Sequence, residues 1–505
     1  MANSSCNQCA AKTCCSSVSR RSFLAQAGVA SLSAFAPSSL RAADPARQQP
    51  IRNTLKVQPV LIYNLGKRRE ATSWRSWGAL QTEQDIADEK QRIGRELKQM
   101  SAGIDFPLDV RPIEEAQTVD QAARIAQGDH DVVLQYAASG SGQAIEKLTD
   151  PNKFSIMFVR HRSGPVYLWY EIAHPRFLRK TVDEYGQPGM DVHDVVVDSH
   201  AEILWRLRAL YGLKNTLGKR IIAVGGPSGW GAGGRKAPEI ARTQWKMDIQ
   251  TVPYPDLGER IKKAHQNDAL VRRCRAEAAK YISGKNVTLE TSKTFVENAF
   301  LLTEVFRDLL DEAKTDAITI NSCMGTIMPM SETTACLPLS LLNDDGYMAF
   351  CESDFVVVPS GVLLHYISSK PVFLNDPTYP HDQVVTIAHC TAPRKLDGVN
   401  LEPVRILTHF ESDYGAAPKV EWRKGEKVTN LIPDFASKNW VGFASEVVDN
   451  PFLAICRSQV DVGYKGDEKK LLEKMGGFHW MSSYGDYVKE SGYALKKVGA
   501  ELITI

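Results

Sequence analysis

Residues Arg220 to Gly234 read RIIAVGGPSGWGAGG, and this stretch indicates the fold class of the chain. Its first five residues form a short apolar run with β-branched side chains, which is typical of a buried strand. A glycine-rich loop follows at once, as it often does at the carboxyl edge of a parallel sheet. The segment Ala201–Tyr211 before it has the apolar spacing of a helix. Together these features predict an α/β unit.

The same alternation of strand-like and helix-like segments extends in both directions from this stretch. The predicted strands are Val60–Tyr63, Val132–Leu134, Ile156–Val159, Asp248–Val252 and Ala317–Ile320. The predicted helices are Thr82–Met100, Leu257–His265 and Thr288–Ala313. Such alternation favours largely parallel sheets with helices on both sides.

The pattern changes after about Ser331, where short strand-like segments become dense. They are Phe355–Val358, Val384–Ala388, Val404–Thr408, Val420–Trp422 and Lys427–Ile432, and turn residues separate them. This spacing predicts a mixed or antiparallel β domain. A chain of 505 residues is too long for one core. We therefore predict an N-terminal α/β domain over 56–212, a second α/β domain over 213–345 and a β-rich C-terminal domain over 346–505.

The composition is that of an ordinary soluble protein, with 43% hydrophobic and 24% charged residues. The formal net charge of +2 gives no electrostatic reason to expect a nucleic-acid partner. Beyond the N-terminus, no apolar run is long enough to cross a bilayer. We expect no stable membrane insertion once the N-terminal segment is removed.

The N-terminus has the pattern of a twin-arginine export signal. Ser19–Leu24 reads SRRSFL, and a weakly apolar stretch follows to Ala36. We predict that residues 1–43 are a signal peptide read by the twin-arginine (Tat) export machinery, so that the mature protein is periplasmic. The alternative is an amphipathic or disordered tail. Export in the folded state suits a protein that takes up a metal in the cytoplasm.

The glycine-rich loop Gly225–Gly234 allows two interpretations. Exposed amides after a strand could bind an anion. However, the spacing of the glycines is not GxGxxG and no Lys-Ser/Thr pair follows, so neither a dinucleotide fingerprint nor a P-loop is present. The favoured interpretation is a flexible loop at the sheet edge. A nucleotide-dependent oxidoreductase is therefore disfavoured, and we predict no nucleotide cofactor.

Two carboxylates stand close together in the segment Met348–Val358. Glu352 and Asp354 lie two residues apart on a strand-like run, so both should point to the same face. Like charges on one face between apolar flanks persist when a cation lies between them. A solvated sheet edge is the alternative. The segment therefore indicates a metal or ligand site.

Two histidines have settings that suit a site. His389 ends the apolar strand Val384–Ala388, just before the loop that contains Pro393. His479 follows Gly476 and Gly477 and lies between aromatic residues, as a metal-ligand loop would allow. Each histidine taken alone is more often a packed structural residue.

Taken together, these stretches resemble the L-fucose/L-arabinose isomerase-like superfamily. The resemblance rests on an ordered set of motifs: Glu332…Cys336-Leu-Pro, Leu342-Asn-Asp-x-Gly346, Cys351-Glu-Ser-Asp354, His389-Cys-Thr-Ala-Pro393 and His479…Tyr484-Gly-Asp486. It implies two Rossmann-like domains, a β-rich, barrel-like C-terminal domain, and a homo-oligomer that is a trimer or hexamer. It also implies a divalent ion, usually Mn²⁺, held by Glu332, Asp354 and His479. Glu352 competes with Asp354 for its position, and His389 is a further possible ligand or substrate contact.

The function implied by the resemblance is aldose–ketose isomerisation of a sugar or sugar derivative. A divalent cation can chelate a carbonyl and the neighbouring hydroxyl and stabilise the enediolate between them. Glu332 and Asp354 would then serve both as ligands and as the acid/base pair. Two alternatives remain open, an exported sugar-binding protein without catalysis and another metal-dependent carbohydrate enzyme, such as an epimerase or lyase.

Overall fold

The computed structural model describes residues 50–67, 69–71, 77–172 and 189–505. The predicted export signal lies outside the described residues. Among the helices of the described part, none is long and apolar enough to cross a membrane.

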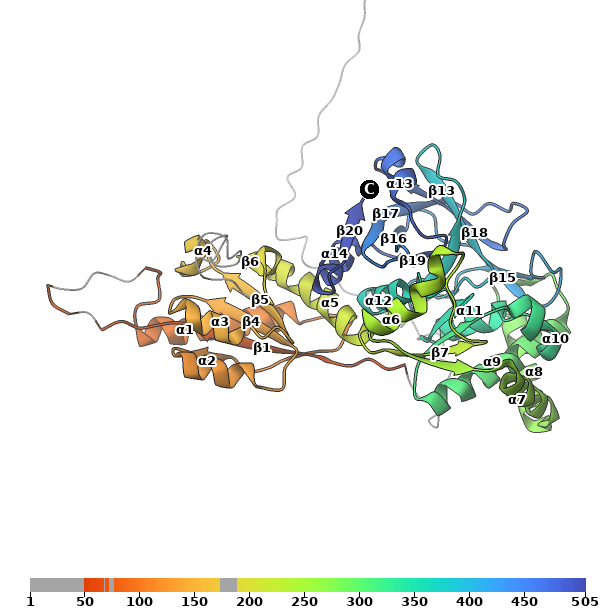
Figure 1. Ribbon diagram of the computed structural model, residues 1–505, viewed down its shortest axis with the longest axis horizontal. Coiled ribbons are helices and arrows are strands. Elements are labelled where there is room, and N and C mark those ends of the chain that lie inside the picture. The colour runs from red at the N-terminus through yellow and green to blue at the C-terminus, as the bar shows by residue number, and fades with distance from the viewer. Residues whose placement is uncertain (1–49, 68, 72–76, 173–188) are drawn as a thin grey trace, which may run out of the picture. The chain divides into compact units, whose positions relative to one another are not determined.

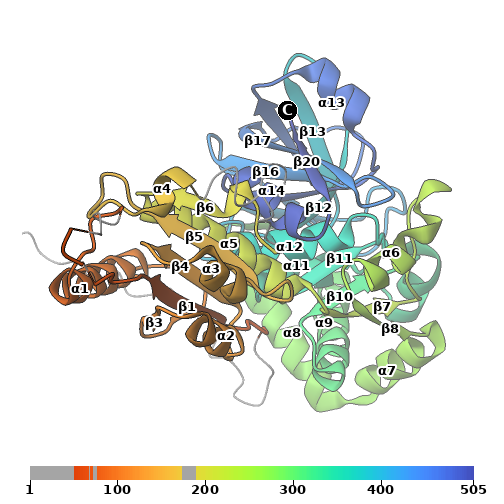
Figure 2. The same cartoon turned by 60° about the vertical axis from the view of Figure 1, so that its left-hand side comes forward.

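The first sheet is entirely parallel and follows the order β2-β1-β4-β5-β6, with β3 also paired to β1. Figures 1 and 2 show its central strands side by side with helices next to them. Its strands are β1 (Leu55–Ile62), β2 (Leu108–Val110), β3 (Glu114–Ala116), β4 (Val132–Ala137), β5 (Phe154–Val159) and β6 (Val195–Val197). Its helices are α1 (Glu83–Met100), α2 (Val119–Ala126), α3 (Gly142–Leu148), α4 (Trp169–Ile172) and α5 (His200–Thr216).

The second sheet is also parallel, in the order β11-β10-β7-β8. Its strands are β7 (Arg220–Val224), β8 (Asp248–Val252), β10 (Ala317–Ile320) and β11 (Met348–Cys351). The helices of this region are α6 (Ala237–Thr243), α7 (Tyr254–Gln266), α8 (Asp268–Ile282), α9 (Lys293–Ala313), α10 (Met328–Ser331) and α11 (Cys336–Asp344). The predicted bounds of β7, β8 and β10 are confirmed. β7 and β10 are largely buried apolar runs, and a glycine, proline or asparagine follows each of the three strands.

The C-terminal region is a closed antiparallel barrel. Its strands follow the order β16-β19-β12-β13-β18-β17, and β16 pairs with β17 to close the ring, while β20 adds in parallel to β17. These strands are β12 (Phe373–Pro377), β13 (Val384–His389), β16 (Lys427–Ile432), β17 (Asn439–Asp449), β18 (Ser458–Tyr464), β19 (Trp480–Tyr484) and β20 (Glu501–Thr504). A small sheet of β9 (Val287–Leu289), β14 (Val404–Leu407) and β15 (Ala417–Val420) lies apart from the ring, and α12 (Val358–Ser368), α13 (Glu468–Lys474) and α14 (Val488–Lys497) complete the chain. The predicted sequence of parallel α/β regions followed by a barrel-like β region is confirmed.

The junction between the second sheet and the barrel differs from the prediction. β11 pairs with β10, although the predicted boundary at residue 345 placed it in the C-terminal domain. The predicted strand Phe355–Val358 is wrong, because these residues form a turn that leads into α12. Every residue of α12 is buried. A helix that is apolar all round has no helical periodicity, so its first residues resemble a buried strand.

The hydrophobic core is divided between two clusters that bear on the site. One cluster joins the first sheet with α5 and α12, and the other joins the second sheet with the barrel strands. The end of β11 and the neighbouring barrel strands therefore rest on one packed core. Side chains that meet there are held by close-packed elements, as a precise site requires.

Helix α12 carries a buried histidine that predicts acid sensitivity. Burial is the main cause that lowers the pKa of His365 to about 3, with Arg52 and Lys219 adding repulsion, and its Nδ1 has no hydrogen-bond partner. Because the folded-state pKa lies below the unfolded value of about 6.5, the stabilising effect of neutral His365 is complete above pH 6.5 and is lost as the pH falls toward 3. We expect the free energy of unfolding to fall by up to about 1.4 kcal/mol per pH unit from this one group.

The measurement is the unfolding midpoint in urea at pH 7.5 and at pH 5 for the wild type and for His365→Gln. We expect the difference between the two pH values to be smaller in the variant. His265→Gln provides the control, because His265 is exposed near the end of α7. An equal pH dependence in all three proteins would contradict the prediction.

Candidate metal centre

Four titratable side chains converge where β11 ends against one end of the barrel. Glu352 lies in the turn after β11, Asp376 on β12, His389 at the last position of β13 and His479 just before β19. β12 pairs with both β13 and β19, so the last three residues come from adjacent strands. The four residues are up to 127 positions apart in the chain; the barrel pairings bring Asp376, His389 and His479 together, and the turn after β11 adds Glu352.

The turn that carries Glu352 is held by the glycine-rich loop. Ser228 N donates to Ser353 O at 3.0 Å, and Phe355 N donates to Ser228 O at 2.9 Å. Glu352 and Ser353 both have positive φ angles, 66° and 46°. Such angles are costly for residues other than glycine and persist where neighbouring structure fixes them. The turn, rather than the predicted strand, is therefore what directs Glu352 and Asp354 toward one histidine.

The glycine-rich loop is packed, which contrasts with its interpretation as a flexible loop. A Cβ atom on Gly229 would lie 2.0 Å from the carbonyl oxygen of Gly234, so the backbone at Gly229 packs directly against the backbone at Gly234. The amide of Trp230 donates to Asp354 Oδ1 at 3.1 Å. At this position the loop amide binds a carboxylate of the protein itself.

The atoms that face one another form a set of nitrogen and oxygen donors. His479 Nε2 lies 3.2 Å from Glu352 Oε2 and 3.2 Å from Asp376 Oδ1. His389 Nε2 lies 3.5 Å from Glu352 Oε1. The two imidazole rings are almost fully buried, while the side chain of Glu352 is 42% exposed and that of Asp376 is 27% exposed. The buried nitrogens thus lie next to carboxylates that solvent can reach.

The residues fit a divalent metal ion. His389 Nε2, His479 Nε2 and Asp376 Oδ1 are buried atoms without an aligned hydrogen-bond partner, although such atoms are nearly always paired in folded proteins. Two imidazoles and two carboxylates are donors that transition metals accept. Cys351 adds a thiol, since one ligand atom from each of Cys351, Glu352 and His389 lies within 4.8 Å of the other two.

Asp354 lies behind His479 instead of beside the open side of the site. Its Oδ2 accepts from His479 Nδ1 at 2.7 Å, and its Oδ1 accepts from the amides of Trp230 and Val356 at 3.1 and 3.0 Å. Both oxygens are therefore occupied, and the side chain is 3% exposed. A carboxylate that holds Nδ1–H of a histidine leaves Nε2 free to bind a metal. These contacts suit Asp354 to hold the ring of His479 in position, and its predicted ligand and acid/base roles stay predictions.

No hydrogen bond or ion pair of the described residues joins Glu332 to this cluster. It follows α10 with a φ angle of 51°, and its side chain is exposed. Its backbone carbonyl accepts from Asn298 Nδ2 at 3.2 Å, whereas no hydrogen bond or ion pair within the described residues reaches its carboxylate. Of the five predicted site residues, close ion pairs and hydrogen bonds link Glu352, Asp354, His389 and His479. The role of Glu332 stays a prediction.

The electrostatics of the cluster follow from close pairing under partial burial. Burial alone would raise the pKa of Glu352, but the close, charged imidazoles of His389 and His479 outweigh it and hold the pKa far below its usual range. Burial likewise opposes the charged histidines, yet the acidic partners raise the pKa of His389 to about 9 and that of His479 to about 10. Burial raises the pKa of Asp376. The two carboxylates thus differ in their affinity for a proton.

Sequence reasoning did not find Asp376 or the nearby thiol of Cys351. Asp376 follows Val372–Leu374, a short buried apolar run, and precedes Pro377. An acidic residue at the end of a buried strand, before a proline, was the available signal. It is weak, because acidic residues before proline are common in exposed turns as well.

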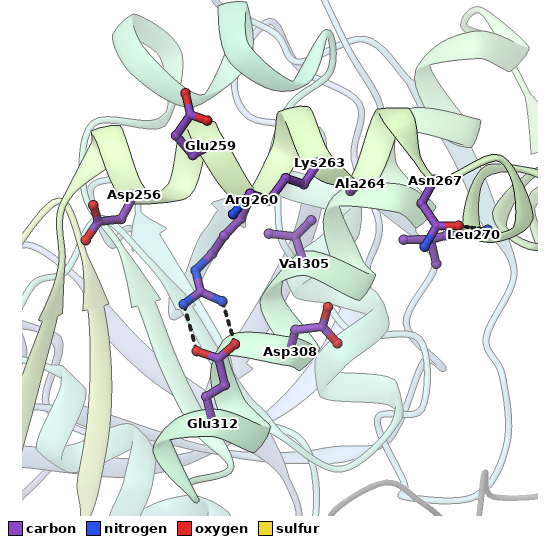
Figure 3. Close-up of a pocket in the computed structure, with 10 residues that line it drawn as sticks. All are labelled: Asp256, Glu259, Arg260, Lys263, Ala264, Asn267, Leu270, Val305, Asp308 and Glu312. Atoms are coloured by element: carbon purple, nitrogen blue, oxygen red, sulfur yellow. Dashed lines mark hydrogen bonds and ion pairs between the residues drawn. The ribbon is translucent and has the colours of Figure 1, made fainter.

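A second candidate location is a groove of about 560 Å³ between α7, α8 and α9. Figure 3 shows Arg260 reaching from α7 to Glu312, with which it makes two hydrogen bonds of 2.7 Å. Four acidic and two basic side chains line it, and one of the basic ones, Arg260, is paired with Glu312. Because the groove has no cluster of buried unpaired donor atoms like the one beside β11, we assign no site to it.

Comparisons with known proteins add no assignment. No protein-family model matches the chain, and no curated protein matches it.

Proposed function

We propose that the protein is a metal-dependent aldose–ketose isomerase that acts on a sugar or sugar derivative. One observation carries the proposal: Glu352 lies 3.2 and 3.5 Å from the Nε2 atoms of two buried histidines, His479 and His389, and Asp376 lies 3.2 Å from the first of them. A buried aspartate, Asp354, holds that same imidazole from its other side. The resemblance to the L-fucose/L-arabinose isomerase-like superfamily supports it. So does the fold, since two parallel sheets before a barrel agree with the Rossmann-like plan of that superfamily.

In this proposal the ligands of a divalent ion, Mn²⁺ by the resemblance, are His389, His479 and Glu352. Such an ion acts as a Lewis acid that polarises a carbonyl and the adjacent hydroxyl. Glu352 stays ionised between the two imidazoles, which suits a ligand. His479 presents Nε2 because Asp354 holds its Nδ1–H.

The proton transfer falls to Asp376. Isomerisation removes a proton from the carbon next to the carbonyl and returns it to the former carbonyl carbon. Asp376 is partly exposed, lies 3.2 Å from His479 Nε2 and has no hydrogen-bond donor on its Oδ1. A carboxylate in this setting can take the proton from one carbon and deliver it to its neighbour. Asp354 cannot do so, because its oxygens are occupied and buried.

The test uses the purified full chain, its metal content and a panel of aldoses and ketoses. We expect bound divalent metal, turnover that stops after treatment with a chelator, and recovery on addition of Mn²⁺. Proton NMR in deuterated water should show deuterium at the carbon next to the carbonyl of the product. Sugar binding without any turnover would instead identify a binding protein, an inverted aldose an epimerase, and a dehydrated product a lyase.

Export and assembly are further parts of the proposal. The Arg20-Arg21 pair with the apolar stretch after it supports transport by the twin-arginine (Tat) route to the periplasm. Replacement of both arginines by lysine should leave the protein in the cytoplasm, as measured by cell fractionation. The superfamily resemblance supports a trimer or hexamer, which light scattering of the purified protein would measure.

A further inference from the structure

Two large aromatic side chains are exposed next to the candidate metal centre. Trp230 is 46% exposed and Phe478 is 43% exposed. Their rings stack on each other with centroids 4.2 Å apart and planes 16° apart. Aromatic rings of this size usually bury most of their surface, and exposed apolar groups that cluster often mark a binding surface.

The stacked pair lies against His479. The Phe478 ring is 5.0 Å from the His479 ring at 80°, and the Trp230 ring is 6.4 Å away at 85°. Both aromatics thus meet the imidazole edge to face. The apolar surface thus adjoins the ring of His479, whose Nε2 lies 3.2 Å from both Glu352 and Asp376.

The backbone holds Trp230 in this exposed place. Its amide is bonded to Asp354, and the two residues before it belong to the packed part of the loop, with Ser228 paired to the 353–355 segment. Gly233 touches the ring of Phe435, since a Cβ atom there would lie 2.9 Å from that ring. A ring that is fixed before binding loses little conformational freedom when a ligand stacks on it.

The ligand chemistry follows from the combination of surfaces. A sugar ring has an apolar face of C–H groups and a polar rim of hydroxyls. A flat aromatic surface beside two carboxylates and two imidazoles complements both, in the way that small-molecule sites pair apolar walls with a few polar groups. A purely polar site would not need two aromatic side chains kept partly in water.

We infer that Trp230 and Phe478 form a stacking platform that binds the C–H face of the sugar ring and thereby determines which carbohydrates the enzyme accepts. The inference rests on the proposed function for the chemical class of the substrate. The platform contacts carbons away from the reacting pair, so its contribution is to affinity and selectivity.

The experiment compares Trp230→Ala, Trp230→Phe and Phe478→Ala with the wild-type full chain. Loss of a stacking partner should raise KM for the converted sugar about tenfold and leave kcat within about threefold, while the phenylalanine at position 230 restores most of the affinity. Metal content should stay at the wild-type level, because the backbone amide that binds Asp354 remains in every variant. Trp77→Ala is the matched control, since Trp77 is 62% exposed on another part of the chain.

A second measurement separates this inference from the proposed function. Sugar binding is followed by calorimetry and by tryptophan fluorescence in the presence of chelator, where no turnover is needed. Weaker binding in Trp230→Ala than in Trp77→Ala supports the platform even if no sugar is converted. Unchanged KM and unchanged binding in Trp230→Ala and Phe478→Ala would overturn it, even if the wild type proves to be an isomerase. A parallel loss of metal in Trp230→Ala would also overturn it, because the residue would then be structural.

Discussion

Glu352→Gln is expected to abolish both metal retention and turnover, whereas Glu332→Gln should leave both near the wild-type level. Glu352 has one oxygen 3.5 Å from His389 Nε2 and the other 3.2 Å from His479 Nε2. The amide removes the negative charge that links the two imidazoles and places an NH₂ group against one of them. Loss of a ligand with a catalytic role should lower kcat/KM by on the order of 10³-fold or more.

The pair of variants is informative because the chemical change is the same at both positions. Metal content after gel filtration, measured by mass spectrometry, gives the first result, and the rate of sugar conversion gives the second. Circular dichroism should show that both variants are folded, since Glu332 is exposed and Glu352 is partly exposed. An equal loss in Glu332→Gln would place its carboxylate in the metal site after all and contradict the present assignment.

The fold was more readable from the sequence than the site. The strands β7 and β8 were predicted with their observed bounds, because each is an alternating or apolar run that ends at glycine or proline. Local pattern decides such elements. Helix α8, in contrast, was not predicted, since it follows α7 with only Asn267 between them and its apolar face is narrow.

The site shows where local pattern stops being informative. Glu352 and Asp354 were expected to share the face of a strand, and they do approach the same histidine. They do so through a turn with two positive φ angles, however. Neither glutamate nor serine is a residue type that signals such a turn. Asp376 enters the site through the pairing of β12 with β19, a contact between positions about a hundred residues apart. Pairings at such distance depend on the whole sheet and leave no local signal.

The difference between Glu332 and Asp376 has the same origin. A family resemblance assigns site roles by matching motifs in the sequence. It assigned a ligand role to Glu332 because of the Cys336-Leu-Pro segment that follows it. Spatial proximity instead identifies Asp376, whose carboxylate lies 3.2 Å from His479 Nε2. The two criteria agree on His479, whose loop is fixed both by the glycines before it and by Asp354 behind it.

Asp354→Asn is expected to lower metal affinity and turnover by on the order of 10²-fold or more, although the change adds and removes no bulk. Asp354 Oδ1 receives two backbone amides, so an asparagine would keep its oxygen there and turn its NH₂ group toward His479 Nδ1. His479 Nδ1 would then have to accept a hydrogen bond in place of donating one. The neutral imidazole would carry its proton on Nε2, and a protonated nitrogen cannot bind a metal.

This prediction tests the effect of the His479 tautomer on metal binding separately from the effect of a lost negative charge elsewhere in the barrel. Asp461→Asn is the matched control, because Asp461 lies on β18 and accepts from Thr386 Oγ1 at 2.6 Å without touching the cluster. Calorimetric titration with Mn²⁺ measures the affinity, and ¹⁵N NMR of labelled histidine reports which nitrogen of His479 carries the proton. If Asp354→Asn binds metal as tightly as Asp461→Asn, then the proton on Nδ1 is not what keeps Nε2 available. The assignment of His479 as a metal ligand would fail with it, because a ligand whose second nitrogen is already committed to Asp354 can reach the ion only through Nε2.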